Sequence, residues 1–175
     1  MEHWENIHKE VGELFLKHEL LKIQRLIELQ SKKFDVDKQY YFLTVNPKPT
    51  IGLRDFIKTV EKALSKKWMN YCLYVYEQRG ECEAELGKGF HTHIIFKKNL
   101  THTHTLREMK NSFKNMCDTD NYHVYNIKNI GEEEKLRKIQ YILDKKADDN
   151  KHLKQSMDII WRQKEKLKSH YIIEQ

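Results

Sequence analysis

The chain has 175 residues, of which 39% are hydrophobic and 33% charged, a composition that suits one compact domain and excludes a disordered chain. Lys and Arg outnumber Asp and Glu by 32 to 26, and the net charge of +6 favours a polyanionic partner. No segment approaches the roughly 20 apolar residues of a membrane helix, and the polar N-terminus lacks a signal-peptide pattern. The three cysteines form no CxxC pair, so we expect reduced thiols in a soluble, intracellular protein.

The first predicted element is a long helix over residues 3–30, where leucines and isoleucines recur at helical spacing. Its apolar face is wider than one stripe and has to be buried. We therefore expect this helix to pack on the rest of the protein or on a partner subunit, which makes it a route to oligomerisation. The chain then divides into a helical extension (1–33), a central domain (34–150) and a C-terminal helix (151–175).

Strands and helices alternate through the central domain. The predicted elements are a strand over 40–45, a helix over 53–64, strands over 70–77 and 90–97, a helix from Thr105 and a strand over 122–127. The order βαββαβ predicts an α+β fold with a ferredoxin-like or RRM-like antiparallel sheet and helices on one face. In that topology the first and third strands lie inside, which places residues 90–97 at the sheet centre.

Three further features concern the helices. Thr105 and Glu108 have the spacing of a capping box at the start of a helix. A helix is predicted over 132–146, with Leu136, Ile139 and Leu143 facing the sheet. A final helix is predicted over 153–167, after a break at 147–150.

The segment His91-Thr92-His93 lies within the predicted central strand. Side chains alternate along a strand, so the two imidazoles share a face and can bind one divalent ion. The alternative is a pair of solvent-facing histidines on an open sheet. A second pair, His102 and His104, precedes a helix, and we interpret it as loop and cap residues.

Glu77 is the predicted third ligand, because it ends the strand that should pair antiparallel with the His91-Thr92-His93 strand. Its carboxylate would favour Mg²⁺ or Mn²⁺, which prefer oxygen ligands. The alternative carboxylates, Glu81, Glu83 and Glu85, lie in the polar loop over 78–89.

Tyr141 and Lys145 lie four residues apart on the predicted helix, and therefore on one face. A tyrosine outside the apolar stripe is not required for the core. Its phenolate can attack a phosphodiester, and the lysine can position or neutralise a phosphate.

In combination, these motifs resemble the HUH endonucleases, especially the rolling-circle replication initiators of small circular DNA viruses and plasmids. The family's first motif is matched by Phe42-Leu43-Thr44-Val45-Asn46, the second by His91-Thr92-His93, and the third by Tyr141 with Lys145. The resemblance covers roughly residues 38–150. The spacing from Tyr141 to Lys145 is one residue longer than in many viral members.

The resemblance implies a sequence-specific single-strand DNA endonuclease that also joins strands. A divalent ion, Mg²⁺ or Mn²⁺, would polarise the scissile phosphate, and Tyr141 would form a 5′-phosphotyrosine link and release a 3′-OH. The substrate would be a replication-origin stem-loop, contacted by Thr44, Asn46, Lys48 and Lys146. No GxxxxGK[ST] phosphate loop is present, so a helicase would come from a host or separate protein.

Two other functions fit parts of the pattern. A single-tyrosine HUH transposase would use the same chemistry on a transposon-end hairpin. An RNA-recognition module shares the βαββαβ order, and Lys88-Gly89-Phe90 begins its third-strand signature. His91, Thr92 and His93 then break the signature and replace its stacking aromatics. A structural zinc protein is disfavoured by the three scattered cysteines.

Overall fold

The computed structural model describes residues 18, 20–22, 38–143 and 149–174. The chain separates into two units, Met1–Asp37 and Lys38–Gln175. In the first unit, His18 and residues 20–22 are helical, and the rest of the predicted helix over 3–30 lies outside the described residues. Among the helices that are described, none has the length and apolarity needed to cross a bilayer.

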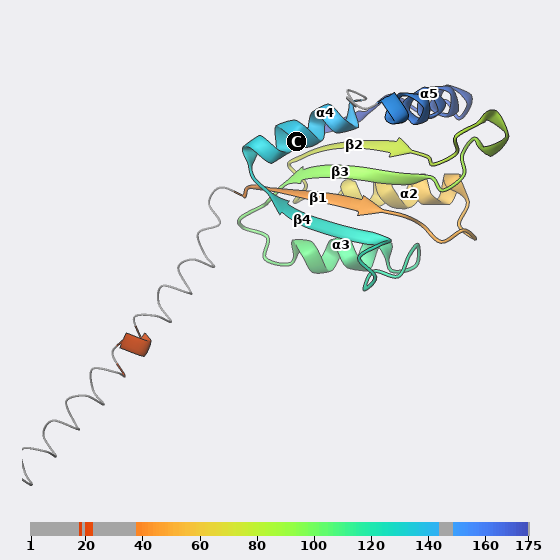
Figure 1. The fold of residues 1–175 in the computed structure, drawn as a ribbon. Coiled ribbons are helices and arrows are strands. Elements are labelled where there is room, and N and C mark those ends of the chain that lie inside the picture. Colours follow the sequence, from red (N-terminus) through yellow and green to blue (C-terminus); the bar gives the residue numbers. More distant parts are fainter. Residues whose placement is uncertain (1–17, 19, 23–37, 144–148, 175) are drawn as a thin grey trace, which may run out of the picture. The chain divides into compact units, whose positions relative to one another are not determined.

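The second unit is α+β and contains a five-stranded antiparallel sheet in the order β4-β1-β3-β2-β5 (Figure 1). Its central strand, β3, is buried on both faces along most of its length, as expected for a strand rich in apolar and β-branched residues. The described strands are β1 (Tyr40–Val45), β2 (Tyr71–Glu77), β3 (His91–Lys97), β4 (Tyr125–Ile130) and β5 (Tyr171–Glu174).

Two helices, α2 (Leu53–Leu64) and α3 (Thr105–Phe113), cover one face of this sheet (Figure 1). Their buried side chains meet the strands in one continuous core that includes Phe56 of α2, Phe113 of α3 and Ile94 of β3. Burial of such side chains is the main stabilising term of the fold.

Helix α4 (Glu132–Ile142) packs on the opposite face, where Ile142 is fully buried against a second apolar cluster. The prediction that Leu136 faces the sheet is wrong, since 54% of that side chain is exposed. The reason is a shift of the buried stripe by one residue. The ammonium groups of Lys135 and Lys138 lie 4.3 and 4.9 Å from aromatic ring centroids of β1, so lysines occupy the sheet-facing positions of the first turns.

The C-terminal region differs most from its prediction. Helix α5 (Asp149–Lys164) begins and ends earlier than expected, and the chain then forms β5, a strand that was not predicted. Strand β4 also starts at Tyr125 and not at Tyr122, because the amides of Val124 and Tyr125 both donate to the carbonyl of Asn121 in a turn.

The capping box predicted at the start of α3 is not formed. The helix does begin at Thr105, but the Thr105 hydroxyl donates to the carbonyl of His102. The carboxylate of Glu108 instead accepts hydrogen bonds from Trp68 and Lys66. A tertiary contact has therefore replaced the local one.

Candidate metal centre

Glu77, His91 and His93 converge on the α4 face of the sheet, at the end of β2 and the start of β3. Strand pairing sets Glu77 directly opposite His91 and sets Val75 opposite His93. Residues that lie opposite each other on paired strands share a face of the sheet, and so do residues two positions apart on one strand. The side chains of Glu77, His91 and His93 therefore lie on the same face. One donor atom from each lies within 4.8 Å of the other two. The predicted position of Glu77 beside His91 is confirmed.

The distances within this group suit a shared divalent ion. Oε2 of Glu77 is 3.8 Å from Nε2 of His91 and 3.7 Å from Nε2 of His93. Two donors bound to one Mg²⁺ at about 2.1 Å are separated by about 3–4 Å. All three side chains are buried, so the binding groups are held by the core. Two imidazoles and one carboxylate form a ligand set that accepts Mg²⁺, Mn²⁺ or a softer divalent metal.

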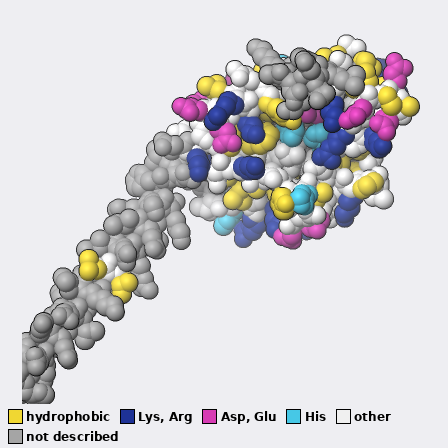
Figure 2. Space-filling model, viewed as in Figure 1, with side chains coloured by type: hydrophobic (Ala, Val, Ile, Leu, Met, Phe, Trp, Pro, Cys, Tyr) yellow, Lys and Arg dark blue, Asp and Glu magenta, His cyan; other side chains and the backbone are white. Residues whose placement is uncertain are grey.

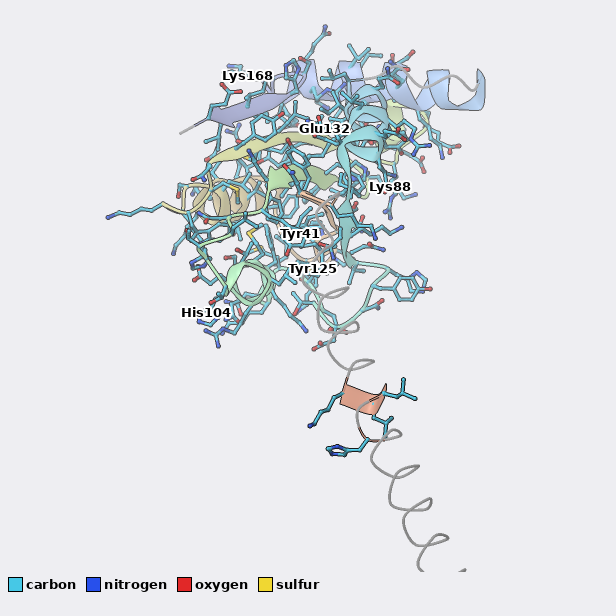
Figure 3. All side chains as sticks on the ribbon, turned by 90° about the vertical axis from the view of Figure 1, so that its left-hand side faces the viewer. Tyr41, Lys88, His104, Tyr125, Glu132 and Lys168 are labelled. Carbon is cyan, nitrogen blue, oxygen red and sulfur yellow. The ribbon has the colours of Figure 1, made fainter. Side chains whose placement is uncertain are left out.

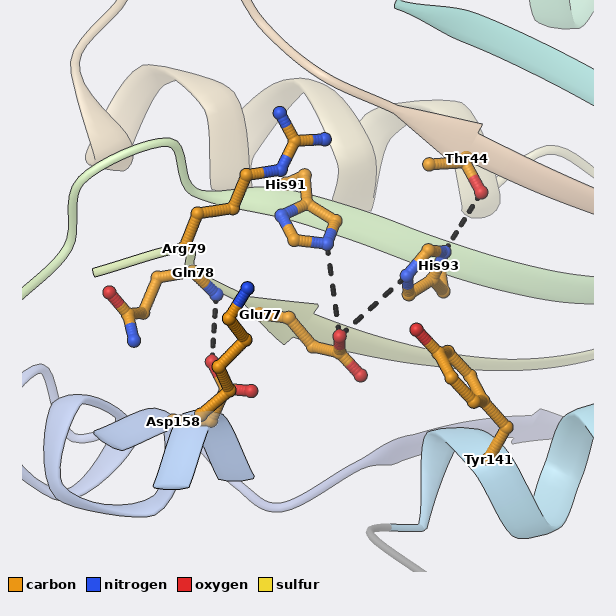
Figure 4. A pocket seen from close by; sticks show the side chains of 9 residues that line it. Thr44, Glu77, Gln78, Arg79, His91, His93, Tyr141 and Asp158 are labelled. Carbon is orange, nitrogen blue, oxygen red and sulfur yellow. Dashed lines mark hydrogen bonds and ion pairs between the residues drawn. The ribbon is translucent and has the colours of Figure 1, made fainter. Parts of the chain in front are cut away.

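Each histidine is oriented through its other ring nitrogen. Nδ1 of His91 lies 3.1 Å from the carbonyl of Gly89, which can only accept, so Nδ1 carries a hydrogen, and in the neutral imidazole Nε2 has the lone pair. Nδ1 of His93 lies 2.8 Å from Oγ1 of Thr44. Such outer contacts fix ring orientation at metal sites. Figure 4 shows both Nε2 atoms directed toward Glu77.

Gly89 adopts a left-handed conformation with φ of 60°. That conformation is strained for other L-residues, and a Cβ at this position would lie 3.3 Å from Cβ of Arg79. Glycine is therefore the residue that this backbone conformation beside His91 favours.

A cavity of about 350 Å³ opens beside Glu77, His91 and His93, and Tyr141 of α4 lines it. The Tyr141 ring centroid is 5.9 Å from that of His93, with the planes at 72°. The side chain is 38% exposed, and its hydroxyl is directed toward the space between His93 and Glu77 (Figure 4). The complete lining is Thr44, Glu77, Gln78, Arg79, His91, His93, Tyr141, Lys154 and Asp158.

The other predicted site residues fall into three groups. Thr44 lines the cavity, whereas Asn46 and Lys48 do not. Asn46 accepts a hydrogen bond from the lining residue Arg79, and Lys48 is exposed. Lys145 and Lys146 lie outside the described residues. The loop carboxylates are away from the centre, with Glu85 paired to Lys88 at 2.8 Å and Glu81 paired to Lys154 at 2.9 Å.

Arg79 is a cavity residue that sequence reasoning missed. Nη2 of Arg79 donates to Oδ1 of Asn46 at 2.6 Å, which holds the guanidinium over the rim near His91 (Figure 4). Arg79 lies two residues beyond the end of β2, where strand alternation no longer indicates the direction of a side chain. Figure 2 shows several Lys and Arg side chains near a group of histidines on one face.

The second histidine pair has a different role. The ring of His102 stacks on Trp68 with centroids 5.0 Å apart, and Nε2 of His102 is 2.9 Å from Oε1 of Glu108. Hydrogen bonds from Trp68 and Lys66 lower the pKa of Glu108 to about 2. His104 is the N-cap residue, directly before the first residue of α3, on the side of the molecule away from Glu132 of α4 (Figure 3). The interpretation of this pair as loop and cap residues is confirmed.

Comparison with known proteins finds no matching family model, no similar curated protein and no similar solved structure. The function is therefore argued from the geometry of the site.

Proposed function

We propose that this protein is a divalent-metal-dependent enzyme of the HUH type that nicks and rejoins single-stranded DNA through Tyr141. The observation that carries the proposal is the convergence of Glu77, His91 and His93 within 4.8 Å, beside a cavity that Tyr141 also lines. We also assign the sheet to the ferredoxin-like class, since β4-β1-β3-β2 is that fold's strand order.

The ligand residues would hold Mg²⁺ or Mn²⁺. Such an ion polarises a non-bridging phosphate oxygen and so makes the phosphorus more electrophilic. The protein's contribution is a rigid, buried frame. His91 and His93 are fixed through their Nδ1 atoms, and their Nε2 atoms are presented together with the Glu77 carboxylate. A preorganised site of this kind requires little rearrangement when it binds.

Tyr141 is the proposed nucleophile. Its phenolic oxygen forms a bond to phosphorus while the bond from phosphorus to the 3′ oxygen breaks. The phenol proton passes through solvent, and the departing 3′ oxygen takes up one proton. The products are a 5′-phosphotyrosine link and a free 3′-OH. Attack by a 3′-OH on the same phosphorus reverses the step and joins strands. Tyr141 is 38% exposed and lines the cavity, which supports access of a DNA strand to this residue.

Arg79 is the cation we assign to the phosphate. It lines the cavity and is held by Asn46. A guanidinium can bind two phosphate oxygens at once. Lys145, which the sequence resemblance assigns to the same task, lies outside the described residues.

Replication initiation and single-strand transposition share this chemistry, and they differ in the DNA that is cut. An RNA-recognition module is less well supported by the site. Its stacking aromatics would need an open sheet face, whereas Ile139 and Ile142 of α4 cover part of that face here.

The test is covalent capture of DNA. The full-length protein is incubated with Mn²⁺ and a pool of 5′-labelled and 3′-labelled single strands that carry a random central region. We expect an SDS-stable adduct that keeps the 3′ label, and a shortened 5′-labelled strand. Tyr141→Phe should form no adduct while folding normally, because it removes only the nucleophilic oxygen.

Tyr122→Phe is the matched control, since that tyrosine is 66% exposed and does not line the cavity. An adduct that peptide mapping places on Tyr122 would refute the assignment, as would full cleavage in excess EDTA. Sequencing of the captured strands then separates an origin stem-loop from a transposon-end hairpin.

A further inference from the structure

Helix α5 directs two buried charged side chains at the end of β2. Asp158 is 1% exposed and Arg162 is 3% exposed. They are four residues apart and therefore lie on one face of the helix. Ionisable groups are rarely buried so completely unless they have specific partners.

Their partners are the two peptide groups on either side of Glu77. Oδ1 of Asp158 accepts a hydrogen bond from the amide of Gln78 at 2.8 Å (Figure 4). Nη1 of Arg162 donates to the carbonyl of Tyr76 at 3.2 Å. A negative group thus holds the amide that follows Glu77, and a positive group holds the carbonyl that precedes it.

This arrangement completes an edge of the sheet. The pairing of β5 with β2 ends at Tyr74, opposite Tyr171, although β2 continues to Glu77. Buried backbone groups beyond that point need hydrogen-bond partners. Asp158 and Arg162 supply them, in the place that a longer strand would otherwise occupy.

Asp158 and Arg162, with their hydrogen bonds to the backbone around Glu77, form a clamp that extends to the loop that carries Gly89. The buried side chain of Gln78 accepts from the amide of Gly80 at 2.6 Å and donates to the carbonyl of Gly80 at 3.0 Å. Trp161 lies between Asp158 and Arg162 in the sequence. Its Nε1 packs so closely on Gly87 that a Cβ added to this glycine would lie 3.0 Å from it. One turn of α5 therefore contacts both the strand end and the following loop.

We infer that Asp158 and Arg162 are positioning residues, which hold the backbone of Glu77 so that its carboxylate reaches the metal shared with His91 and His93. The inference rests on the proposed function. It predicts that α5 controls metal affinity through hydrogen bonds to the peptide groups that flank Glu77, with no direct ligation by its own side chains.

The experiment measures Mn²⁺ affinity of the full-length protein by the loss of the free-ion EPR signal. Asp158→Ala and Arg162→Met remove the two hydrogen bonds, and each should weaken Mn²⁺ binding about tenfold, the range seen for outer contacts of metal sites. Asp158→Asn keeps an oxygen that accepts from Gln78, and should bind within about threefold of the wild type. Gln163→Ala, an exposed change on the same helix, is the control and should have no effect.

The outcomes separate the two proposals. If wild-type protein binds no Mn²⁺, the proposed function fails and this inference fails with it. If wild type binds and Glu77→Ala weakens binding while Asp158→Ala and Arg162→Met do not, only the inference is overturned. Asp158→Asn binding as poorly as Asp158→Ala would also overturn it, because the carboxylate would then act by its charge or as a ligand.

If a variant fails to fold, a measurement on the unaltered protein still tests the inference. If the clamp and the metal site are coupled, the effect is reciprocal. Mg²⁺ should slow hydrogen exchange of the Gln78 amide several-fold more than exchange of amides on the exposed face of α3. An unchanged Gln78 amide in metal-saturated protein would overturn the inference.

Discussion

The chain contains the same motif, His-Thr-His, in two places that the fold treats differently. His91 and His93 lie on the central strand and are buried, with Nε2 atoms 3.8 and 3.7 Å from one carboxylate oxygen. His102 and His104 lie in a loop before α3, are more exposed, and have ring centroids 6.2 Å apart. The comparison shows that spacing alone does not bring two imidazoles and a carboxylate together.

The difference lies in the carboxylate that each pair meets. Glu77 faces both imidazoles of the strand pair. Glu108 contacts only His102 of the loop pair, and it also binds Trp68 and Lys66. A carboxylate already neutralised by an ammonium group adds little attraction for a cation. A strand also holds two histidines on one face, whereas a loop fixes no such relation.

The largest expected effect separates the two pairs directly. His91→Ala and His93→Ala should each weaken Mn²⁺ binding by more than about 100-fold, since loss of a ligand exceeds the loss of an outer contact. His102→Ala and His104→Ala should leave the affinity unchanged. Isothermal titration of the four variants measures this, and equal losses from both pairs would show that the loop pair also binds metal.

The next effect concerns the carboxylate. Glu77→Ala should raise the Mn²⁺ concentration for half-maximal DNA cleavage at least about tenfold, and Glu77→Gln should raise it less because an amide oxygen can still ligate. Glu85→Ala is the matched loop variant and should behave as wild type. If the Mn²⁺ concentration for half-maximal cleavage rises in Glu85→Ala and not in Glu77→Ala, the assignment of Glu77 as the ligand is wrong.

A smaller effect is expected at the backbone that supports His91. Gly89→Ala forces a left-handed φ of 60° on an L-residue, and should lower the free energy of unfolding by about 1–2 kcal/mol. It should also weaken metal binding several-fold by displacing the Gly89 carbonyl. Gly52→Ala, where a Cβ has its nearest neighbour at 4.0 Å, should do neither. Urea unfolding with and without Mn²⁺ measures both quantities.

The smallest effect tests the structural role of the loop pair. The folded pKa of Glu108 lies at about 2, below its ordinary 4.5, because Trp68 and Lys66 donate to the carboxylate. The ionised form therefore stabilises the fold above about pH 4.5, and this contribution is lost as the pH falls toward 2. Glu108→Gln should flatten this part of the dependence of melting temperature on pH. An identical pH profile in the variant would show that the contact is energetically silent.

Local rules predicted the centre of the site well. Strand alternation placed His91 and His93 on one face, and the pairing of consecutive strands placed Glu77 opposite His91. The helix that carries Tyr141 was predicted over residues 132–146, and the structure has it over Glu132–Ile142. These inferences needed only neighbouring elements, and for that reason they could be made from sequence.

Contacts between distant segments could not be predicted in this way. The hydrogen bond from the Gln78 amide to Asp158 joins residues 80 positions apart, and no periodicity marks Asp158 as its acceptor. The buried stripe of α4 was misplaced because aromatic rings of β1 accept Lys135 and Lys138. Strand β5 was missed because four residues are too short for an alternation pattern to be distinctive.

The late position of α5 and β5 in the chain has a consequence for folding. Pairing of β5 with β2 joins segments near residues 72 and 173, which requires closure of a long loop and is expected to be slow. Until that step, one edge of β2 remains open, and open edges invite pairing with other chains. We expect the nascent sheet to be prone to aggregation before these segments dock, and the hydrogen bonds from α5 to the end of β2 to form only at the end of folding.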